Sequence, residues 1–356
     1  MRPRLILSNL VITDHATIVF KTFVLQGGDL RYIKCKGLKK DWSVITFGCW
    51  QIAPSEGWGN ICSPQSADAV VKKALELGVS AFDTAEGYGD GESERRLGKA
   101  LGHKKQDVII ISKIWPDASL TSDNYHKRLN DSLKALNRDY VDVYLVHFPS
   151  TYFNSIEQSE KLCALMEELK KSGKAVTVGL SNFMDKNLLR LGKGIHEFCI
   201  NQVPYNILQR DYEGKTRDIC QKNEIAYMAY SPTAQGLLAG RLSNEATAFP
   251  ARKWNKLYQE PLLTKSKPVR SLINNIAEEI KTKPISVALA WVLEQKNILT
   301  AIVGSRKPDQ VSEFALAGNL KLSAEHLNQL NNVSLSFYRK RKGLFRALKK
   351  RYFEKK

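Results

Sequence analysis

The 356-residue sequence contains only six cysteines, and none of them forms a Cys-x-x-Cys pair. This pattern argues against a zinc ribbon or a disulfide scaffold and is typical of a protein of the reducing cytoplasm. No apolar run approaches the roughly 20 residues that a membrane-spanning helix needs. The opening MRPRLILSNLVITDH has arginines before an apolar run, but Asn9, Asp14 and His15 interrupt it and no small-residue cleavage site follows. We therefore expect a cytoplasmic protein without a signal peptide.

Acidic residues are scarce relative to basic ones, which gives a formal net charge of +18. Half of the excess lies in residues 339–356, where ten Lys or Arg and one Glu give a net charge of +9. In this basic tail, Leu344, Phe345, Leu348 and Tyr352 can share one helical face. The tail is either a solvated, partly disordered segment or a weak tether to an anionic membrane surface. No motif for specific nucleic-acid recognition is present, and charge alone supports only salt-sensitive binding.

Eight short apolar runs recur through the body of the chain, which is long and apolar enough to form one large domain. They span residues 44–49, 79–83, 108–113, 141–147, 176–181, 199–203, 225–230 and 299–303. Their continuous rather than alternating hydrophobicity indicates strands buried on both faces, as in a parallel sheet. Eight strand-then-helix units in series favour an α/β fold, a (β/α)8 TIM barrel, over a doubly wound sheet.

Segments of helical period separate most of these runs. One apolar helical face is formed by Ala67, Val70, Val71, Ala74 and Leu77. Similar patterns cover residues 122–136, 159–170 and 272–280. Glycines stand where helix C-caps are expected, at Gly78, Gly102 and Gly173. The connection over residues 231–268 is long for a βα loop, which is typical of a functional or mobile segment.

We expect three parts along the chain. Residues 1–29 form an N-terminal extension whose role the sequence does not indicate, either a strand pair or a poorly ordered segment. Residues 30–338 form the barrel, which is preceded by an N-terminal hairpin turning at Gly37. Residues 339–356 form the basic tail.

Polar side chains stand at the ends of several predicted strands, where the catalytic residues of barrel enzymes lie. The first four are Asp83, Tyr88 in the following loop, Lys113 and His147. A lysine in an apolar run must be paired or neutral, because an isolated buried charge costs several kcal/mol, and Asp83 on the neighbouring strand is the expected partner. The buried ammonium is expected to lower the pKa of Tyr88 from about 10, which would make the phenol a general acid for a carbonyl oxygen that His147 orients.

A carbonyl that is protonated on oxygen must be attacked at carbon, and a nicotinamide hydride meets this need. Tyr230 is expected to stack on the nicotinamide ring, and candidate partners for its carboxamide are Ser181, Asn182 and Gln202. Near the C-terminus, Gly304, Ser305 and Arg306 precede a helix that begins at Pro308. A hydroxyl, a guanidinium and a helix N-terminus are the parts of a phosphate site.

Several of these segments together resemble the aldo-keto reductase family over roughly residues 30–320. They are FDTAEGYGDGESERRLGKAL, ISKIWP, DYVDVYLVHFP, VTVGLSNF, NQVPYN, AYSPTAQGLLAG and VGSRKPDQVSEF. The resemblance implies a (β/α)8 barrel that binds NADPH extended across its mouth without a Rossmann motif. It also implies that Tyr88 is the acid, that Lys113 and Asp83 tune it, and that His147 orients the carbonyl.

The resemblance implies further binding residues. Those around the nicotinamide and the pyrophosphate would be Ser181, Asn182, Gln202, Tyr230, Ser231, Gly236 and Leu237. Those around the 2′-phosphate and adenine would be Gly304, Ser305, Arg306, Gln310 and Glu313. Those facing the substrate would be Trp50 and Trp115. Phe314 departs from the family pattern, which commonly has Asn after the preceding Glu.

The sequence therefore predicts an NADP-preferring oxidoreductase that reduces a small aldehyde or ketone, with NADH as an alternative cofactor. A nucleotide-sensing binding subunit with little turnover is the alternative function, although all four catalytic residues are present. Metal-assisted hydrolysis is disfavoured because a single histidine lies at the strand ends, so no metal site is expected. Glycoside cleavage is disfavoured because Asp83 lies next to Lys113 rather than a second carboxylate. The sequence does not indicate the oligomeric state.

Overall fold

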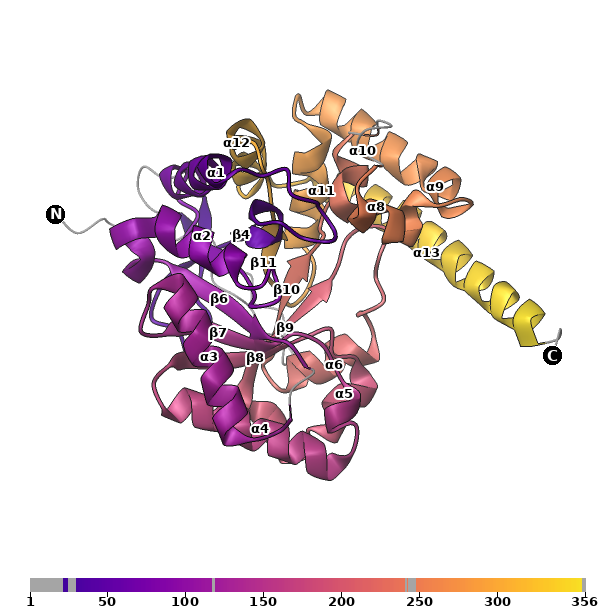
Figure 1. Ribbon diagram of the computed structural model, residues 1–356. Coiled ribbons are helices and arrows are strands. Elements are labelled where there is room, and N and C mark those ends of the chain that lie inside the picture. Colours follow the sequence, from indigo (N-terminus) through magenta and orange to yellow (C-terminus); the bar gives the residue numbers. More distant parts are fainter. Residues whose placement is uncertain (1–21, 25–29, 117–118, 241, 243–247, 354–356) are drawn as a thin grey trace.

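The computed structural model describes residues 22–24, 30–116, 119–240, 242 and 248–353 (Figure 1). Its strands are β1 (Thr22–Val24), β2 (Arg31–Ile33), β3 (Trp42–Ser43), β4 (Ile45–Gly48), β5 (Ala81–Asp83), β6 (Ile109–Ile114), β7 (Val141–Val146), β8 (Ala175–Ser181), β9 (Phe198–Pro204), β10 (Ala226–Tyr230) and β11 (Ile298–Val303). Its α-helices are α1 (Pro64–Glu76), α2 (Glu92–Leu101), α3 (Ser122–Leu136), α4 (Ile156–Lys171), α5 (Asp185–Arg190), α6 (Lys215–Lys222), α8 (Pro250–Trp254), α9 (Leu262–Lys265), α10 (Lys267–Glu279), α11 (Pro284–Leu293), α12 (Pro308–Ala317) and α13 (Ala324–Phe353).

Strands β4 to β11 form a closed barrel in which β11 pairs with both β10 and β4. Every neighbouring pair in the barrel is parallel. The eight predicted apolar runs are these eight strands, with ends that differ by no more than two residues. The prediction of a (β/α)8 barrel is therefore confirmed, and the carboxyl ends of all eight strands meet at one mouth.

An antiparallel sheet of β1, β2 and β3 covers the opposite end of the barrel. Tyr32 pairs with Ser43 and Ile33 with Trp42, which confirms the predicted hairpin, and β1 adds a third strand from the N-terminal extension. Trp42 is fully buried, and its Nε1 donates a hydrogen bond to Thr46 Oγ1 at 2.9 Å. The rest of the extension lies outside the described residues. The hairpin thus excludes water from the floor of the barrel.

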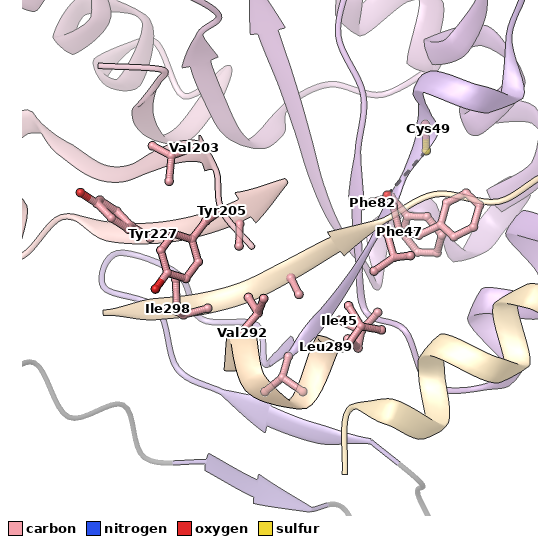
Figure 2. Close-up of a cluster of buried hydrophobic side chains, with 14 of the residues drawn as sticks. Ile45, Phe47, Cys49, Phe82, Val203, Tyr205, Tyr227, Leu289, Val292 and Ile298 are labelled. Carbon is pink, nitrogen blue, oxygen red and sulfur yellow. Dashed lines mark hydrogen bonds between the residues drawn. The ribbon is translucent and has the colours of Figure 1, made fainter. Parts of the chain in front are cut away.

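The main core lies between the barrel wall and the surrounding helices. Figure 2 shows Leu289 and Val292 of α11 directed toward Ile45 of β4 and Ile298 of β11, and all four side chains are buried. Burying an aliphatic side chain of this size contributes about 1.5–3 kcal/mol. Helix α11 is apolar around its whole circumference because it lies against the barrel, α10 and α12. This packing fixes α11 against the first residues of two neighbouring barrel strands.

Helix α13 ends the described chain. Leu330 and Ser334 are fully buried, and Ser334 Oγ donates a hydrogen bond to the carbonyl oxygen of Ile207 at 2.6 Å. The helix continues to Phe353, so the predicted start of the basic tail at residue 339 falls within it. Among the described residues, no helix is long and apolar enough to cross a membrane.

Candidate active site

A cavity of about 1590 Å³ lies at the mouth of the barrel. Fourteen of the predicted site residues line it: Trp50, Asp83, Tyr88, Trp115, His147, Ser181, Asn182, Gln202, Tyr230, Ser231, Gly236, Gly304, Arg306 and Gln310. They come from the carboxyl ends of β4 to β11 and from the segments that follow these strands. The structure therefore brings together residues that are separated by more than 250 positions in the sequence.

Lys113 lies behind the cavity and is fully buried. Its Nζ donates hydrogen bonds to Asp83 Oδ1 at 2.8 Å, to the carbonyl oxygen of Thr84 at 2.7 Å and to Tyr88 Oη at 3.3 Å. The second carboxylate oxygen of Asp83 accepts a hydrogen bond from Gln202 Nε2 at 2.6 Å. All three N–H groups of the ammonium are used, so the buried charge is paired and satisfied.

The ionisation of this group is controlled by its burial. Burial lowers the pKa of Lys113 and raises the pKa of Asp83, while the contact between the two charges opposes both shifts. Each of the two side chains therefore stays charged only because the other is its ion-pair partner. Removal of either partner would leave an uncompensated charge inside the barrel.

The pKa predicted for Tyr88 from the sequence is wrong in direction. Burial, and then the negative charge of Asp83, raise the pKa of the Tyr88 phenol well above its ordinary value. Lys113 was expected to lower it, but Asp83 neutralises that ammonium at 2.8 Å. The free protein consequently holds Tyr88 as a protonated phenol, which is the form that can donate a proton.

His147 lines the cavity next to Tyr88, with 5.6 Å between the ring centroids. Burial, and secondarily the charge of Lys113, lower the pKa of His147 well below its ordinary value, so the imidazole is neutral at pH 7. Its Nδ1 is buried and has no hydrogen-bond partner among the described residues. The Trp115 ring packs against it at a centroid distance of 5.1 Å. The neutral imidazole lines the cavity, where a ligand can contact its ring.

A hydrogen-bonded cluster at the ends of β8, β9 and β10 forms another wall. Asn182 has a positive φ of 66°, which turns the chain directly after β8. Tyr230 Oη donates a hydrogen bond to Asn182 Oδ1 at 2.8 Å, and Ser181 Oγ donates one to the carbonyl oxygen of Gln202 at 3.0 Å. These contacts fix the orientation of polar groups that line the cavity beside Asp83.

Arg306 lies at the other end of the cavity, at the turn before α12. Its guanidinium stacks over the Phe249 ring at 4.5 Å and lies 5.6 Å from the Trp58 ring centroid. Its Nη1 is buried without a hydrogen-bond partner among the described residues. Burial and the nearby charge of Arg252 lower the pKa of Arg306. A buried cation with an unused donor is suited to bind an anion.

Four predicted site residues do not line the cavity: Lys113, Leu237, Ser305 and Glu313. Ser305 Oγ accepts a hydrogen bond from the Lys307 backbone and donates one to Gln310 Oε1 at 2.9 Å, so it shapes the turn before α12. Glu313 Oε1 accepts a hydrogen bond from Lys283 Nζ at 2.6 Å. Phe314 does line the cavity and packs against Phe47 in the core, at a centroid distance of 6.3 Å.

Several cavity residues were not identified from the sequence. Trp58, Phe249 and Arg252 cluster around Arg306, and Arg252 Nε donates a hydrogen bond to the carbonyl oxygen of Gln235 at 2.8 Å. The unusual length of residues 231–268 was the available signal, and Phe249 and Arg252 lie in that segment. Glu86, which lies behind the cavity lining, was not identified from the sequence either. It accepts hydrogen bonds from the Trp115 backbone and from Arg128, which holds the Trp115 loop.

The cavity fits a long anionic dinucleotide. One end has the protonated Tyr88 and the neutral His147, and the other has the unsatisfied Nη1 of Arg306. Between them, Gly236 has a φ of 100°, and a Cβ there would lie 3.0 Å from Arg252 Nη2. A side chain at position 236 would therefore crowd the Arg252 guanidinium, and glycine leaves that space open. The described part of the chain contains no group of three or more residues that could hold a metal ion.

Comparisons with known proteins identify the family of the chain. A sequence model of the aldo/keto reductase family matches residues 44–334. An uncharacterized oxidoreductase of Mycobacterium tuberculosis is 30% identical over 310 residues, which cover 86% of this chain and 94% of that protein. The NADH-specific methylglyoxal reductase of Escherichia coli is 27% identical over 301 residues, which cover 79% and 91%. An aldo/keto reductase of Klebsiella pneumoniae, solved in complex with NADP and acetate, is 27% identical, with a TM-score of 0.66 and coverage of 83% and 92%.

Proposed function

Because the chain belongs to the aldo/keto reductase family of NAD(P)H-dependent oxidoreductases, we propose that it reduces an aldehyde or ketone to an alcohol, with Tyr88 as the general acid. The observation that carries this proposal is the contact of the Tyr88 phenol with Lys113 at the base of the cavity, at 3.3 Å. The substrate is a small carbonyl compound that enters between Trp50 and Trp115, both of which line the cavity.

The side chains have distinct tasks in this reaction. Bound reduced nicotinamide supplies the hydride that attacks the carbonyl carbon. Tyr88 gives its phenolic proton to the carbonyl oxygen, and Lys113 stabilises the phenolate that remains. His147 is neutral, so it donates a hydrogen bond to the same oxygen without repelling Lys113. Trp50 and Trp115 cover the reacting groups and limit the access of water.

We propose that Ser181, Asn182 and Gln202 bind the nicotinamide carboxamide and that Tyr230 and Ser231 lie against the ring. Arg306 would bind the 2′-phosphate of NADP, because this cation lines the cavity just before the N-terminus of α12. NADP(H) is therefore the preferred cofactor and NADH the weaker one. The complex of the Klebsiella pneumoniae relative with NADP supports this preference, whereas the Escherichia coli relative is named as NADH-specific.

The cellular site that we propose is the cytoplasm. All six cysteines are buried and unpaired in the structure. Free thiols in these numbers are typical of proteins that fold under reducing conditions.

Kinetics of the Tyr88→Phe variant test the mechanism. Purified protein is mixed with NADPH and a panel of aldehydes, and the loss of nicotinamide absorbance is followed. We expect kcat to fall about 10²–10⁴-fold, the usual contribution of a general acid. NADPH binding, measured by fluorescence titration, should persist. Tyr140→Phe is the matched control, because Tyr140 precedes β7 at the opposite end of the barrel.

Unchanged activity in Tyr88→Phe would overturn the role of Tyr88. Tight NADPH binding by the wild-type protein with no turnover of any aldehyde or ketone would instead favour a nucleotide-sensing subunit.

A further inference from the structure

Helix α13 has two halves with different surroundings. The first half packs on the barrel through Leu330, Ser334 and Phe337, which are all buried. Arg341 makes the last described contact of this packed face, an ion pair with Asp211. In Figure 1 the distal end of α13 then projects away from the barrel and the other helices. A helix of 30 residues is about 45 Å long, which is longer than this packing requires.

The packed face of α13 continues into the projecting half. At about 100° per residue, positions 330, 334, 337 and 341 fall within an arc of about 60°. Positions 344, 345, 348 and 352 fall within an arc of about 100° that contains the first arc. The sequence places apolar or aromatic residues at all four of these positions: Leu344, Phe345, Leu348 and Tyr352. An apolar stripe therefore continues beyond the end of the packed face.

The Lys and Arg residues of α13 are confined to the same half. Residues 324–338 contain no Lys or Arg, whereas residues 339–353 contain eight and no acidic residue. Four of these basic residues, Arg339, Lys342, Arg346 and Lys350, fall on the side opposite the apolar stripe, and Lys340, Lys349 and Arg351 flank it. A helix with an apolar stripe and a strongly basic opposite face is the type that lies in a membrane interface.

We propose that residues 342–353 form a docking surface for an anionic phospholipid membrane. The apolar stripe would enter the boundary between headgroups and acyl chains, and the basic residues would contact the lipid phosphates and carboxylates. A second copy of the chain is a poor occupant, because pairing would bring together two segments that each carry a large positive charge. A nucleic acid would match the charge but would leave the apolar stripe unused. Because Arg341 also lines the cavity, docking would place the mouth of the barrel close to the membrane surface.

Sedimentation of the full-length protein with vesicles tests this proposal. One set of vesicles contains phosphatidylcholine alone, and the other contains phosphatidylcholine with phosphatidylserine. We expect at least tenfold stronger partitioning to the anionic vesicles, and we expect it to weaken as the salt concentration rises. The triple variant Arg346→Glu, Lys349→Glu and Lys350→Glu should partition to the anionic vesicles at least tenfold more weakly than the wild type. A matched triple variant on the barrel, Lys161→Glu, Lys186→Glu and Lys193→Glu, reverses three exposed lysines and should retain the binding.

A second variant separates a membrane from other anionic partners. Leu344→Ser with Leu348→Ser keeps the charge and removes half of the apolar stripe, so it should partition at least threefold more weakly. Reductase activity in buffer reports on the fold of each variant, since none of these residues belongs to the site. Equal partitioning to neutral and anionic vesicles would overturn the proposal. Binding that depends on the basic residues but is unaffected by the two serines would also overturn it, in favour of general adhesion to polyanions such as RNA or an acidic protein.

Discussion

Substitution of Asp83 by asparagine removes a charge from a fully enclosed ion pair. Lys113 has no exposed surface, and its Nζ lies 2.8 Å from Asp83 Oδ1. The asparagine amide cannot replace both carboxylate contacts, because Gln202 Nε2 donates to the second oxygen at 2.6 Å. In either orientation of the amide, its NH2 group faces another donor, Lys113 or Gln202.

The expected loss of stability follows from these contacts. Breaking a buried ion pair by removal of one partner costs about 3–5 kcal/mol, because the other charge stays buried without compensation. We therefore expect Asp83→Asn and Lys113→Met each to lower the free energy of unfolding by about that amount. In the double variant no charge is left unpaired, and an apolar side chain of similar length replaces the lysine. The double variant should be more stable than Asp83→Asn alone.

Urea denaturation of the four proteins, followed by circular dichroism, completes a double-mutant cycle. A coupling energy of about 2 kcal/mol or more between the two sites would support the ion pair as the source of the loss. If each single substitution costs less than about 1 kcal/mol, or if the two losses simply add, the reasoning is refuted.

Three further substitutions have expected outcomes. Arg306→Gln should raise the KM for NADPH about 10–100-fold with little change for NADH, because one charged hydrogen bond contributes about 1.5–3 kcal/mol. In steady-state kinetics, an equal rise in KM for both cofactors would contradict the proposed phosphate contact. Burial lowers the pKa of His147 below its ordinary 6.5, so the unfolded state binds a proton more readily and stability falls as the pH drops below 6.5. His147→Gln should reduce this fall in unfolding free energy, measured by urea titration at several pH values. An unchanged dependence of stability on pH would exclude His147 as the source of the fall. Burial raises the pKa of Glu94 from 4.5 to about 7, so its contribution to stability is present below pH 4.5 and is lost as the pH rises through 7. Glu94→Gln should reduce that loss of stability by up to about 3 kcal/mol. If the variant instead showed the same pH dependence of unfolding free energy as the wild type, Glu94 would be ionised in the folded protein.

The barrel was predictable because its strands are short, continuous in hydrophobicity and separated by amphipathic helices. Runs of this length and continuity are typical of strands buried on both faces, and the series of eight closes into a barrel. Because parallel strands share the direction of their carboxyl ends, the same pattern also predicted which side chains meet. Asp83, Lys113 and His147 were identified in this way, and the structure brings all three to the mouth.

Contacts between loops could not be predicted in the same way. The cluster of Trp58, Phe249, Arg252 and Arg306 joins three segments that no periodicity relates. Their proximity depends on how two long connections fold over the barrel. The sequence assigned Ser305 to the phosphate site, and in the structure its hydroxyl accepts a hydrogen bond from the backbone amide of Lys307. A local hydrogen bond of this kind is invisible in a list of residue types.

The error in the predicted pKa of Tyr88 changes the role assigned to Lys113. With Asp83 beside it, the ammonium does not make Tyr88 acidic in the free protein, since the phenol is held in its protonated form. In the proposed mechanism Lys113 would act after the proton has left, because its Nζ already donates to the oxygen that would become negative. On that mechanism the ion pair matters for the reaction rather than for folding. The double variant Asp83→Asn with Lys113→Met is accordingly expected to be stable and inactive. If its inactivity came only from lost stability, activity would instead return at low temperature.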